Sequence, residues 1–275
     1  MISRDEIFQK AAEAKVDPSI VEKDYHLGIA LKTIAEQPAT KDWVFRGGTA
    51  LKKCYFPDYR FSEDLDFTLL SRTLKTEKEI GLVLEQICSK SNQQFGTTLE
   101  FFKVSQEREE YGEEAFKGTL HFQSIKGKSK VKIDLSFVDR VFIEPKTRNI
   151  IHGYSDSNIF GSPHIRTAKL EEIISDKLMA VAFIRTYPRT RDLFDIWYIT
   201  KNEKIDLELV RDTIEKKCKY RKLDKGLLYK IDQKHLEKFR KYWLAQLAAL
   251  VGDLPEFEEV VNGVIAYRDE VFRNN

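Results

Sequence analysis

The segment spanning residues 44–70 constrains the fold of this chain most, because it joins a glycine pair to two alternating acids (VFRGGTALKKCYFPDYRFSEDLDFTLL). We interpret it as a short strand, a turn at Gly47 and Gly48, one or two helical turns from Thr49 to Tyr55, a loop and a second strand. Glycines adopt backbone angles closed to other residues, so the N–H groups of such a turn can point toward an anion. The helix N-terminus that follows also favours a phosphate. The segment therefore predicts a phosphate-binding turn.

Two acids follow on the second expected strand. Asp64 and Asp66 are two residues apart, so both side chains lie on one face of a strand, and Leu65 and Phe67 lie on the other. Adjacent carboxylates repel each other, and a hard divalent cation removes that conflict, because Mg²⁺ is typically held by carboxylates together with substrate phosphates. The combination indicates a nucleoside triphosphate site. Each part alone has a simpler interpretation, as an ordinary turn and as the solvated face of a strand.

The same residues resemble the nucleotidyltransferase toxins of the AbiEii/AbiGii type, relatives of the MenT toxins in the DNA polymerase β-like nucleotidyltransferase superfamily. The superfamily pattern is a Gly-Gly or Gly-Ser turn followed by Asp-x-Asp on the next strand. It is matched here by GGTAL at 47–51 and RFSEDLDF at 60–67, and the form R-x-S-x-D-x-D-F is typical of the toxin branch. The resemblance implies that Asp64 and Asp66 bind Mg²⁺ or Mn²⁺ and that the turn holds the β- and γ-phosphates of a nucleoside triphosphate substrate.

Three polar residues accompany this motif. The resemblance implies that Thr49 assists Gly47 and Gly48 in phosphate binding. Arg60 either neutralises phosphate charge or forms an ion pair with a neighbouring acid. Ser62 either contacts a phosphate or caps the local turn.

A third acid, Asp134, lies in the segment KVKIDLSF at 130–137. Alternation places Lys132, Asp134 and Ser136 on one face of the expected strand and the apolar residues on the other. The resemblance implies a third carboxylate on a neighbouring strand, which serves as a metal ligand or as the base that accepts the proton of the attacking hydroxyl. An exposed strand acid is the alternative interpretation.

Two further motifs lie on expected helices. The segment LEEIISDKL at 170–178 resembles the third motif of the toxin family, and the resemblance implies that Lys177 faces the triphosphate. From the residues alone, a solvated lysine at a helix edge is the simpler interpretation. The segment RTRDLFDIW at 189–197 resembles a fourth motif, in which Asp192 and Asp195 share one helical face. We favour Asp195 as the functional acid, and a plain salt-bridge cluster is the alternative.

The remaining features predict a bilobal α/β (α+β) protein. We expect a nucleotidyltransferase core with a mixed sheet at 1–165 and a mostly helical lobe at 166–275, with the active site in the cleft between them. Asp24, on a helix expected at about 18–36, is interpreted as a solvated acid. The three cysteines are scattered, which suits a reducing cytoplasm. The chain has no apolar run of membrane-spanning length and no signal-peptide core, so no membrane partner is expected.

Taken with the resemblance, these features imply a metal-dependent enzyme that transfers a nucleoside monophosphate from a triphosphate to an acceptor hydroxyl. It would act as the toxin of a bacterial toxin–antitoxin or phage-defence system, with its antitoxin encoded nearby. RNA, especially a tRNA 3′ end, is the acceptor that the family suggests. The basic run at 216–225 could follow its backbone, or could be a solvated helix end. Two alternatives stay open: transfer to a protein or to a small molecule such as an aminoglycoside, and a non-catalytic nucleotide-binding regulator.

Overall fold

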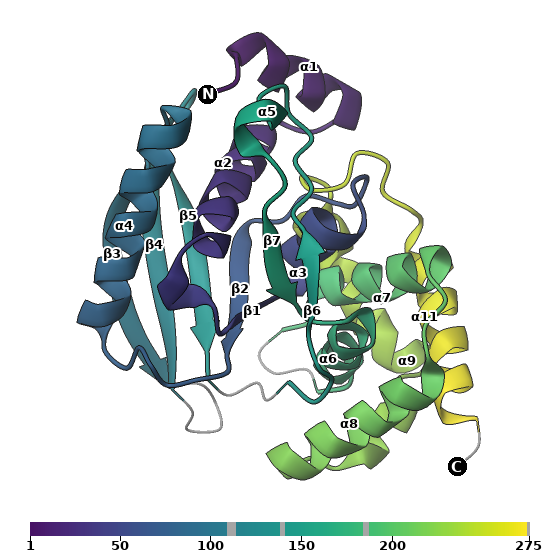
Figure 1. Ribbon diagram of the computed structural model, residues 1–275. Helices are drawn as coiled ribbons and strands as arrows, with labels where there is room; N and C mark the ends of the chain where they lie inside the picture. Colours follow the sequence, from purple (N-terminus) through teal and green to yellow (C-terminus); the bar gives the residue numbers. More distant parts are fainter. Residues whose placement is uncertain (109–113, 138–140, 184–186, 274–275) are drawn as a thin grey trace. The chain divides into compact units, whose positions relative to one another are not determined.

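The computed structural model describes residues 1–108, 114–137, 141–183 and 187–273 (Figure 1). The chain divides into two compact units. Unit 1 comprises residues 1–141 and 145–167, and unit 2 comprises residues 142–144 and 168–275. Among the described residues, no helix combines the length and the apolar character that crossing a bilayer requires.

Unit 1 is built on a mixed sheet, and its described residues form seven strands in the order β3-β4-β5-β2-β1-β7-β6. The strands are β1 (Trp43–Arg46), β2 (Asp64–Leu69), β3 (Glu100–Arg108), β4 (Glu114–Ser124), β5 (Gly127–Ser136), β6 (Lys146–Asn149) and β7 (His164–Thr167). The pairs β2–β5 and β1–β7 are parallel, and the other neighbouring pairs are antiparallel. A mixed α/β fold is therefore confirmed.

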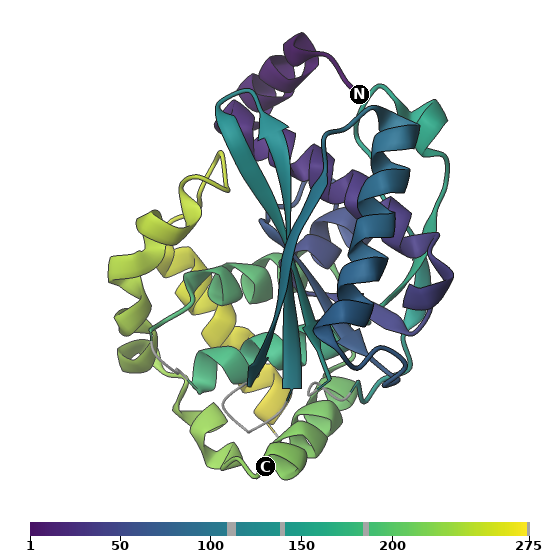
Figure 2. The ribbon, with the colours of Figure 1, turned by 90° about the vertical axis from the view of Figure 1, so that its left-hand side faces the viewer.

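Helices cover one face of this sheet (Figure 2). Unit 1 contains α1 (Arg4–Ala14), α2 (Pro18–Ala35), the 3₁₀ turn η1 (Pro38–Thr40), α3 (Gly47–Ala50), the π-helical turn η2 (Leu51–Tyr55), α4 (Glu77–Phe95) and α5 (Ser157–Phe160). A Cβ atom added to Gly118 of β4 would lie 2.6 Å from the Leu84 side chain of α4, which identifies the covered face. Gly118 is paired with Ile133 of β5, and Ile133 with Leu65 of β2, so these apolar residues point toward the helices.

The opposite face, which we call the outer face, carries the alternate residues of the same strands. Asp64 and Asp66 of β2 and Asp134 of β5 are all one residue removed from the helix-covered positions. Since side chains alternate along a strand, all three acids lie on the outer face. The period-2 pattern of the sequence thus predicted correctly which side of each strand is apolar.

Asp24 of α2 corrects one sequence-based interpretation. Its side chain is not solvated but 3% exposed, and its Oδ2 atom lies 2.6 Å from the Lys53 ammonium of η2. The hydroxyl of Tyr154 donates a hydrogen bond of 2.8 Å to the same oxygen. Burial alone would raise the pKa of Asp24, but attraction to Lys53 and Lys52 lowers it below its ordinary value. A buried ion pair therefore joins α2 to the short helix that follows the glycine turn.

Unit 2 is helical. Its described elements are α6 (Leu170–Ala182), α7 (Thr190–Asn202), α8 (Leu207–Arg221), η3 (Lys225–Lys230), α9 (Gln233–Leu236), η4 (Glu237–Tyr242), α10 (Trp243–Leu247) and α11 (Phe257–Phe272). Lys217 belongs to the basic run noted in the sequence, yet it is buried and forms ion pairs with Glu172 and Asp176. The run is therefore not a continuous exposed strip of cations.

Candidate active site

The glycine turn lies directly against the acidic strand. Strand β1 ends at Arg46, and Gly47 adopts a φ angle of +78°, a left-handed conformation that favours glycine. A Cβ atom at Gly47 would lie 2.3 Å from Oδ2 of Asp66. Position 47 therefore requires glycine for two reasons, its backbone angle and the close approach of the Asp66 carboxylate.

The second glycine brings two more of the predicted residues to the turn. A Cβ atom at Gly48 would lie 2.8 Å from Nη2 of Arg60 and 3.2 Å from Oγ of Ser62. The Arg60 side chain is buried and also donates a hydrogen bond of 3.0 Å to the carbonyl oxygen of Phe61. The turn is thus bordered by a guanidinium group and a hydroxyl, both suited to a phosphate oxygen.

The side chain of Thr49 is bonded to the acidic strand. It is buried, and its hydroxyl donates a hydrogen bond to the backbone carbonyl of Asp64. This bond ties the start of α3 to the start of β2. Any contribution of Thr49 to phosphate binding therefore comes from its backbone N–H group.

Strand register brings the three acids together. Asp66 of β2 and Asp134 of β5 are directly paired across the parallel strands, and Asp64 is paired with Lys132. Neighbouring strands lie about 4.8 Å apart, so the Asp66 and Asp134 carboxylates share one patch of the outer face. Two residues that are 68 positions apart in the sequence are thereby adjacent (134 minus 66).

Without a bound cation, the three carboxylates of this patch repel one another. Burial, followed by repulsion from Asp66 and Asp64, raises the pKa of Asp134 to about 6. The Oδ1 atoms of Asp64 and Asp134 are shielded from solvent and have no hydrogen-bond partner among the described residues. Lys132 offers little relief, because its ammonium lies 3.9 Å from Asp64 Oδ1. Shielded, unsatisfied carboxylate oxygens of this kind fit a hard cation.

The carboxylates are close neighbours, but they do not by themselves form a complete metal-binding site. In the part of the chain that the structure describes, no three Asp, Glu, His or Cys side chains already meet the geometry of a metal site. A cation here would therefore take part of its ligands from elsewhere, as Mg²⁺ does when substrate phosphates and water complete its shell.

Replacing Asp134 should stabilise the metal-free protein at neutral pH. The folded-state pKa of Asp134, about 6, is raised above its ordinary value of 3.8, so the stability that its protonated form provides is complete below pH 3.8 and is lost as pH rises through 6. Asp134→Asn removes that loss, and we expect its free energy of unfolding at pH 8 in EDTA to exceed that of the wild type by about 1–3 kcal/mol.

The gain should shrink as pH falls from 8 toward 4, where the wild-type carboxyl is itself protonated. Urea titrations of both proteins across this range give the measurement. A difference that does not change with pH would contradict the explanation, as would an Asn variant that is less stable than the wild type at pH 8.

Unit 2 holds a second cluster of predicted residues. The ammonium of Lys177 on α6 lies 2.7 Å from Oδ1 of Asp192 and 2.7 Å from Oδ2 of Asp195, both on α7. All three side chains are buried, so the interpretation of Lys177 as a solvated surface lysine is wrong. The distances do not favour Asp195 over Asp192, and the two carboxylates hold the ammonium jointly.

The sequence did not reveal the ion pair of Lys53 with Asp24 or the shared hold of Asp192 and Asp195 on Lys177. Lys53 follows the glycine motif by five positions, but its partner Asp24 lies 29 residues earlier, so no local spacing reveals the pair. For Asp192 a signal existed, because its i, i+3 relation to Asp195 places both acids on one helical face.

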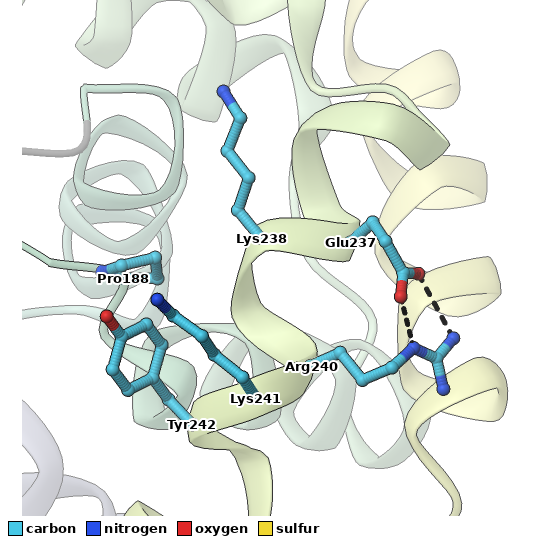
Figure 3. A pocket seen from close by; sticks show the side chains of 6 residues that line it. All are labelled: Pro188, Glu237, Lys238, Arg240, Lys241 and Tyr242. Carbon is cyan, nitrogen blue, oxygen red and sulfur yellow. Dashed lines mark hydrogen bonds and ion pairs between the residues drawn. The ribbon is translucent and has the colours of Figure 1, made fainter.

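A pocket of about 700 Å³ in unit 2 contains none of the predicted site residues (Figure 3). It is lined by Pro188, Glu237, Lys238, Arg240, Lys241 and Tyr242. The positive charge of Arg240 in this pocket is already neutralised, because Arg240 pairs with Glu237 and with Glu258. The chemistry predicted from the sequence lies elsewhere.

Solved structures of other proteins share this fold. MenT4, a nucleotidyltransferase toxin from Mycobacterium tuberculosis, matches with a TM-score of 0.70 and 17% identity, over 100% of this chain and 91% of its own. JHP933 from Helicobacter pylori matches with a TM-score of 0.58 and 19% identity, over 94% of each chain. At these identities the likeness establishes the fold, which is that of the nucleotidyltransferase toxins.

Comparison of the sequence with curated proteins finds no match. A family profile described as "Nucleotidyl transferase AbiEii toxin, Type IV TA system" matches residues 29–263. The chain therefore belongs to the AbiEii family of nucleotidyltransferase toxins of type IV toxin–antitoxin systems, and the family predicted from its motifs is confirmed.

Proposed function

We propose that this nucleotidyltransferase transfers a nucleoside monophosphate from a nucleoside triphosphate to a hydroxyl of RNA, with a tRNA 3′ end as the favoured acceptor, in the cytoplasm. One observation carries the proposal: the glycine turn touches the carboxylate of Asp66, and Asp134 is paired with that residue on the same face. A group that binds phosphate and a group that binds cations therefore meet at one point.

The residues at the turn would hold the triphosphate. Arg60 would supply a charged donor and Ser62 a hydroxyl beside Gly48, and the turn at Gly47 and Gly48 would supply backbone N–H groups. In unit 2, the family motif implies that Lys177 faces the triphosphate, and Asp192 and Asp195 would position its ammonium.

Asp64, Asp66 and Asp134 are the residues that would hold Mg²⁺ or Mn²⁺, since two of them present shielded and unsatisfied oxygens. When bound, such a cation supplies charge stabilisation for the phosphoryl oxygens and orients the reacting groups.

The protein's own contribution to the chemistry is proton transfer. The acceptor hydroxyl oxygen bonds to the α-phosphorus, the bond from that phosphorus to the β-phosphate oxygen breaks, and pyrophosphate leaves. The hydroxyl proton passes to the carboxylate of Asp134 where that residue acts as the base instead of as a cation ligand.

Incubating the protein with each α-labelled nucleoside triphosphate and total RNA, with and without Mg²⁺, tests this proposal. We expect label to enter RNA in the presence of Mg²⁺ and of one or more triphosphates, and no label to enter RNA in EDTA. If the label enters a protein or a small molecule and none enters RNA, RNA is not the acceptor and the labelled species is. Triphosphate binding without any transfer would instead support a non-catalytic regulator.

The family assigns this chain to a system with a cognate antitoxin. We infer that the antitoxin is encoded nearby. To test this inference, the growth of cells that express the chain alone is compared with the growth of cells that express it together with its neighbouring gene. The Asp66→Asn variant provides the inactive control.

A further inference from the structure

A row of lysines extends from the candidate active site along the outer face of the sheet. Lys128, Lys130 and Lys132 alternate along β5, so their side chains share one face, and we call them the lysine row. Lys132 is paired with Asp64 across β2 and β5, which makes this the face that carries the three acids. The row therefore begins beside the carboxylates and leads away from them toward the β4–β5 turn.

The lysine row is available for an external anion. Lys128 and Lys130 are exposed, and neither forms a salt bridge with any described residue, whereas Lys126 pairs with Asp17 and Lys117 with Glu107. Alternate residues of a strand are about 7 Å apart. A line of evenly spaced cations matches the repeating charge of an extended nucleic-acid backbone.

An aromatic platform lies beside the row on the neighbouring strands. The ring of Phe102 on β3 stacks on His121 of β4, with 4.2 Å between ring centroids and an interplanar angle of 26°. Phe102 is 56% exposed, and the strand register shifts between Phe101 and Lys103, as expected of a β-bulge that redirects a side chain. An exposed aromatic ring next to a cationic strip is the usual arrangement of single-strand binding surfaces.

His121 links the two features. It is paired with Lys130 in the β4–β5 register. Desolvation, followed by repulsion from Lys128 and Lys130, lowers the pKa of His121, although Glu100 acts in the opposite direction. The imidazole ring is the flat support on which Phe102 stacks.

We propose that the outer face of β3, β4 and β5 binds a single-stranded segment of the RNA acceptor, with successive phosphates along the lysine row and one base stacked on Phe102. This inference rests on the proposed function, because it takes RNA as the acceptor. The strand would run along β5 and deliver its end to Asp64, Asp66 and Asp134. Base stacking distinguishes RNA from an acidic peptide, which would use the lysines but has no base for the ring.

Binding of a 5′-labelled single-stranded RNA of about ten nucleotides, measured by fluorescence anisotropy over a range of salt concentrations, tests the surface. Without nucleoside triphosphate, we expect Lys128→Gln/Lys130→Gln to weaken binding about tenfold and to reduce the slope of log K against log[salt] by about 1.4, which corresponds to two lost phosphate contacts. Phe102→Ala should weaken binding about tenfold with no change in that slope.

Two matched controls accompany these variants. Lys75→Gln/Lys78→Gln removes the same charge from two exposed lysines, one just before α4 and one in its first turn, and Phe8→Ala removes an exposed ring from α1. Both controls should bind RNA as the wild type does. Thermal unfolding of all four variants verifies that each is folded.

Failure of this inference can be told apart from failure of the proposed function, because binding and transfer are measured separately. If the wild type labels RNA but the lysine variant binds it with unchanged affinity and slope, the surface is wrong and the function stands. If the wild type labels no RNA yet both variants lose binding as expected, the surface stands and the function is wrong. A wild type that does not bind the oligonucleotide overturns the surface. Equal losses in the controls overturn it as well, and so does a Phe102→Ala variant that binds normally while polyglutamate competes as well as RNA.

Discussion

Asp66→Asn should abolish nucleotidyl transfer, with a loss of at least about a thousandfold in the rate of label incorporation. The substitution keeps the size of the side chain and removes its charge. Asp66 is the acid that touches the glycine turn and is paired with Asp134, so its carboxylate is the one shared by the proposed phosphate-binding and cation-binding parts of the site. Rates are measured with α-labelled triphosphate and RNA at saturating Mg²⁺.

The matched control is Asp58→Asn, which removes the same charge from an exposed acid of the loop before β2. It should retain wild-type activity, and both variants should unfold cooperatively. An Asp66→Asn variant that keeps more than about a tenth of the wild-type rate would remove Asp66 from the chemistry. Restored activity at high Mn²⁺ would instead support weakened cation binding as the cause of the loss.

Lys53→Met should lower the free energy of unfolding by about 3–5 kcal/mol, because it leaves the Asp24 carboxylate buried without its cation. Tyr154 still donates its hydrogen bond to that carboxylate but cannot neutralise it. The effect is large compared with the whole stability of a domain, which is about 5–15 kcal/mol. Urea unfolding at pH 7 gives the measurement.

The double variant Asp24→Asn/Lys53→Met separates loss of the ion pair from loss of packing. It should recover most of the stability, because no uncompensated charge remains. Lys52→Met serves as the neighbouring comparison. Lys52 also attracts Asp24, but its hydrogen bonds go to the backbone carbonyls of Pro57 and Tyr59, so its loss should cost less than the loss of Lys53. A double variant as unstable as Lys53→Met alone would show that the buried charge of Asp24 is not the cause.

The pH dependence of Lys53→Met provides a second check. Without Lys53, burial raises the pKa of Asp24 in the folded state above its unfolded value. The stability that protonation supplies is then present below about pH 4 and is lost as pH rises through the folded-state pKa. The deficit of the variant should therefore be smaller at pH 5 than at pH 8.

Features set by neighbouring residues were predictable from the sequence. The glycine turn, the acidic strand β2 and the two faces of β5 follow from local backbone preference and period-2 alternation, and the structure contains each of them. The family resemblance added that a third carboxylate would lie on a neighbouring strand. The β2–β5 register places Asp134 beside Asp66.

Features set by pairing across the fold were not predictable in this way. From the residues alone, Asp24 and Lys177 are interpreted as solvated side chains, because most charged residues on helices are exposed. In the structure both are buried in ion pairs. Thr49 is predicted to assist phosphate binding, but the bond from its hydroxyl to the backbone of β2 follows from no local pattern. In each case the deciding partner lies 15 or more positions away, beyond the reach of helical or strand periodicity.

The position of β2 in the strand order has a consequence for how such an enzyme can diversify. β2 is interior, bonded to β1 on one side and β5 on the other, while β3 is the outermost strand on the β5 side. Interior strands are the last to open, so the proposed catalytic acids lie on a rigid strand. An outermost strand tolerates bulges and exchanges of side chains at little cost to the core. Mutations in β3 could therefore retarget the enzyme toward new acceptors while its chemistry stayed unchanged.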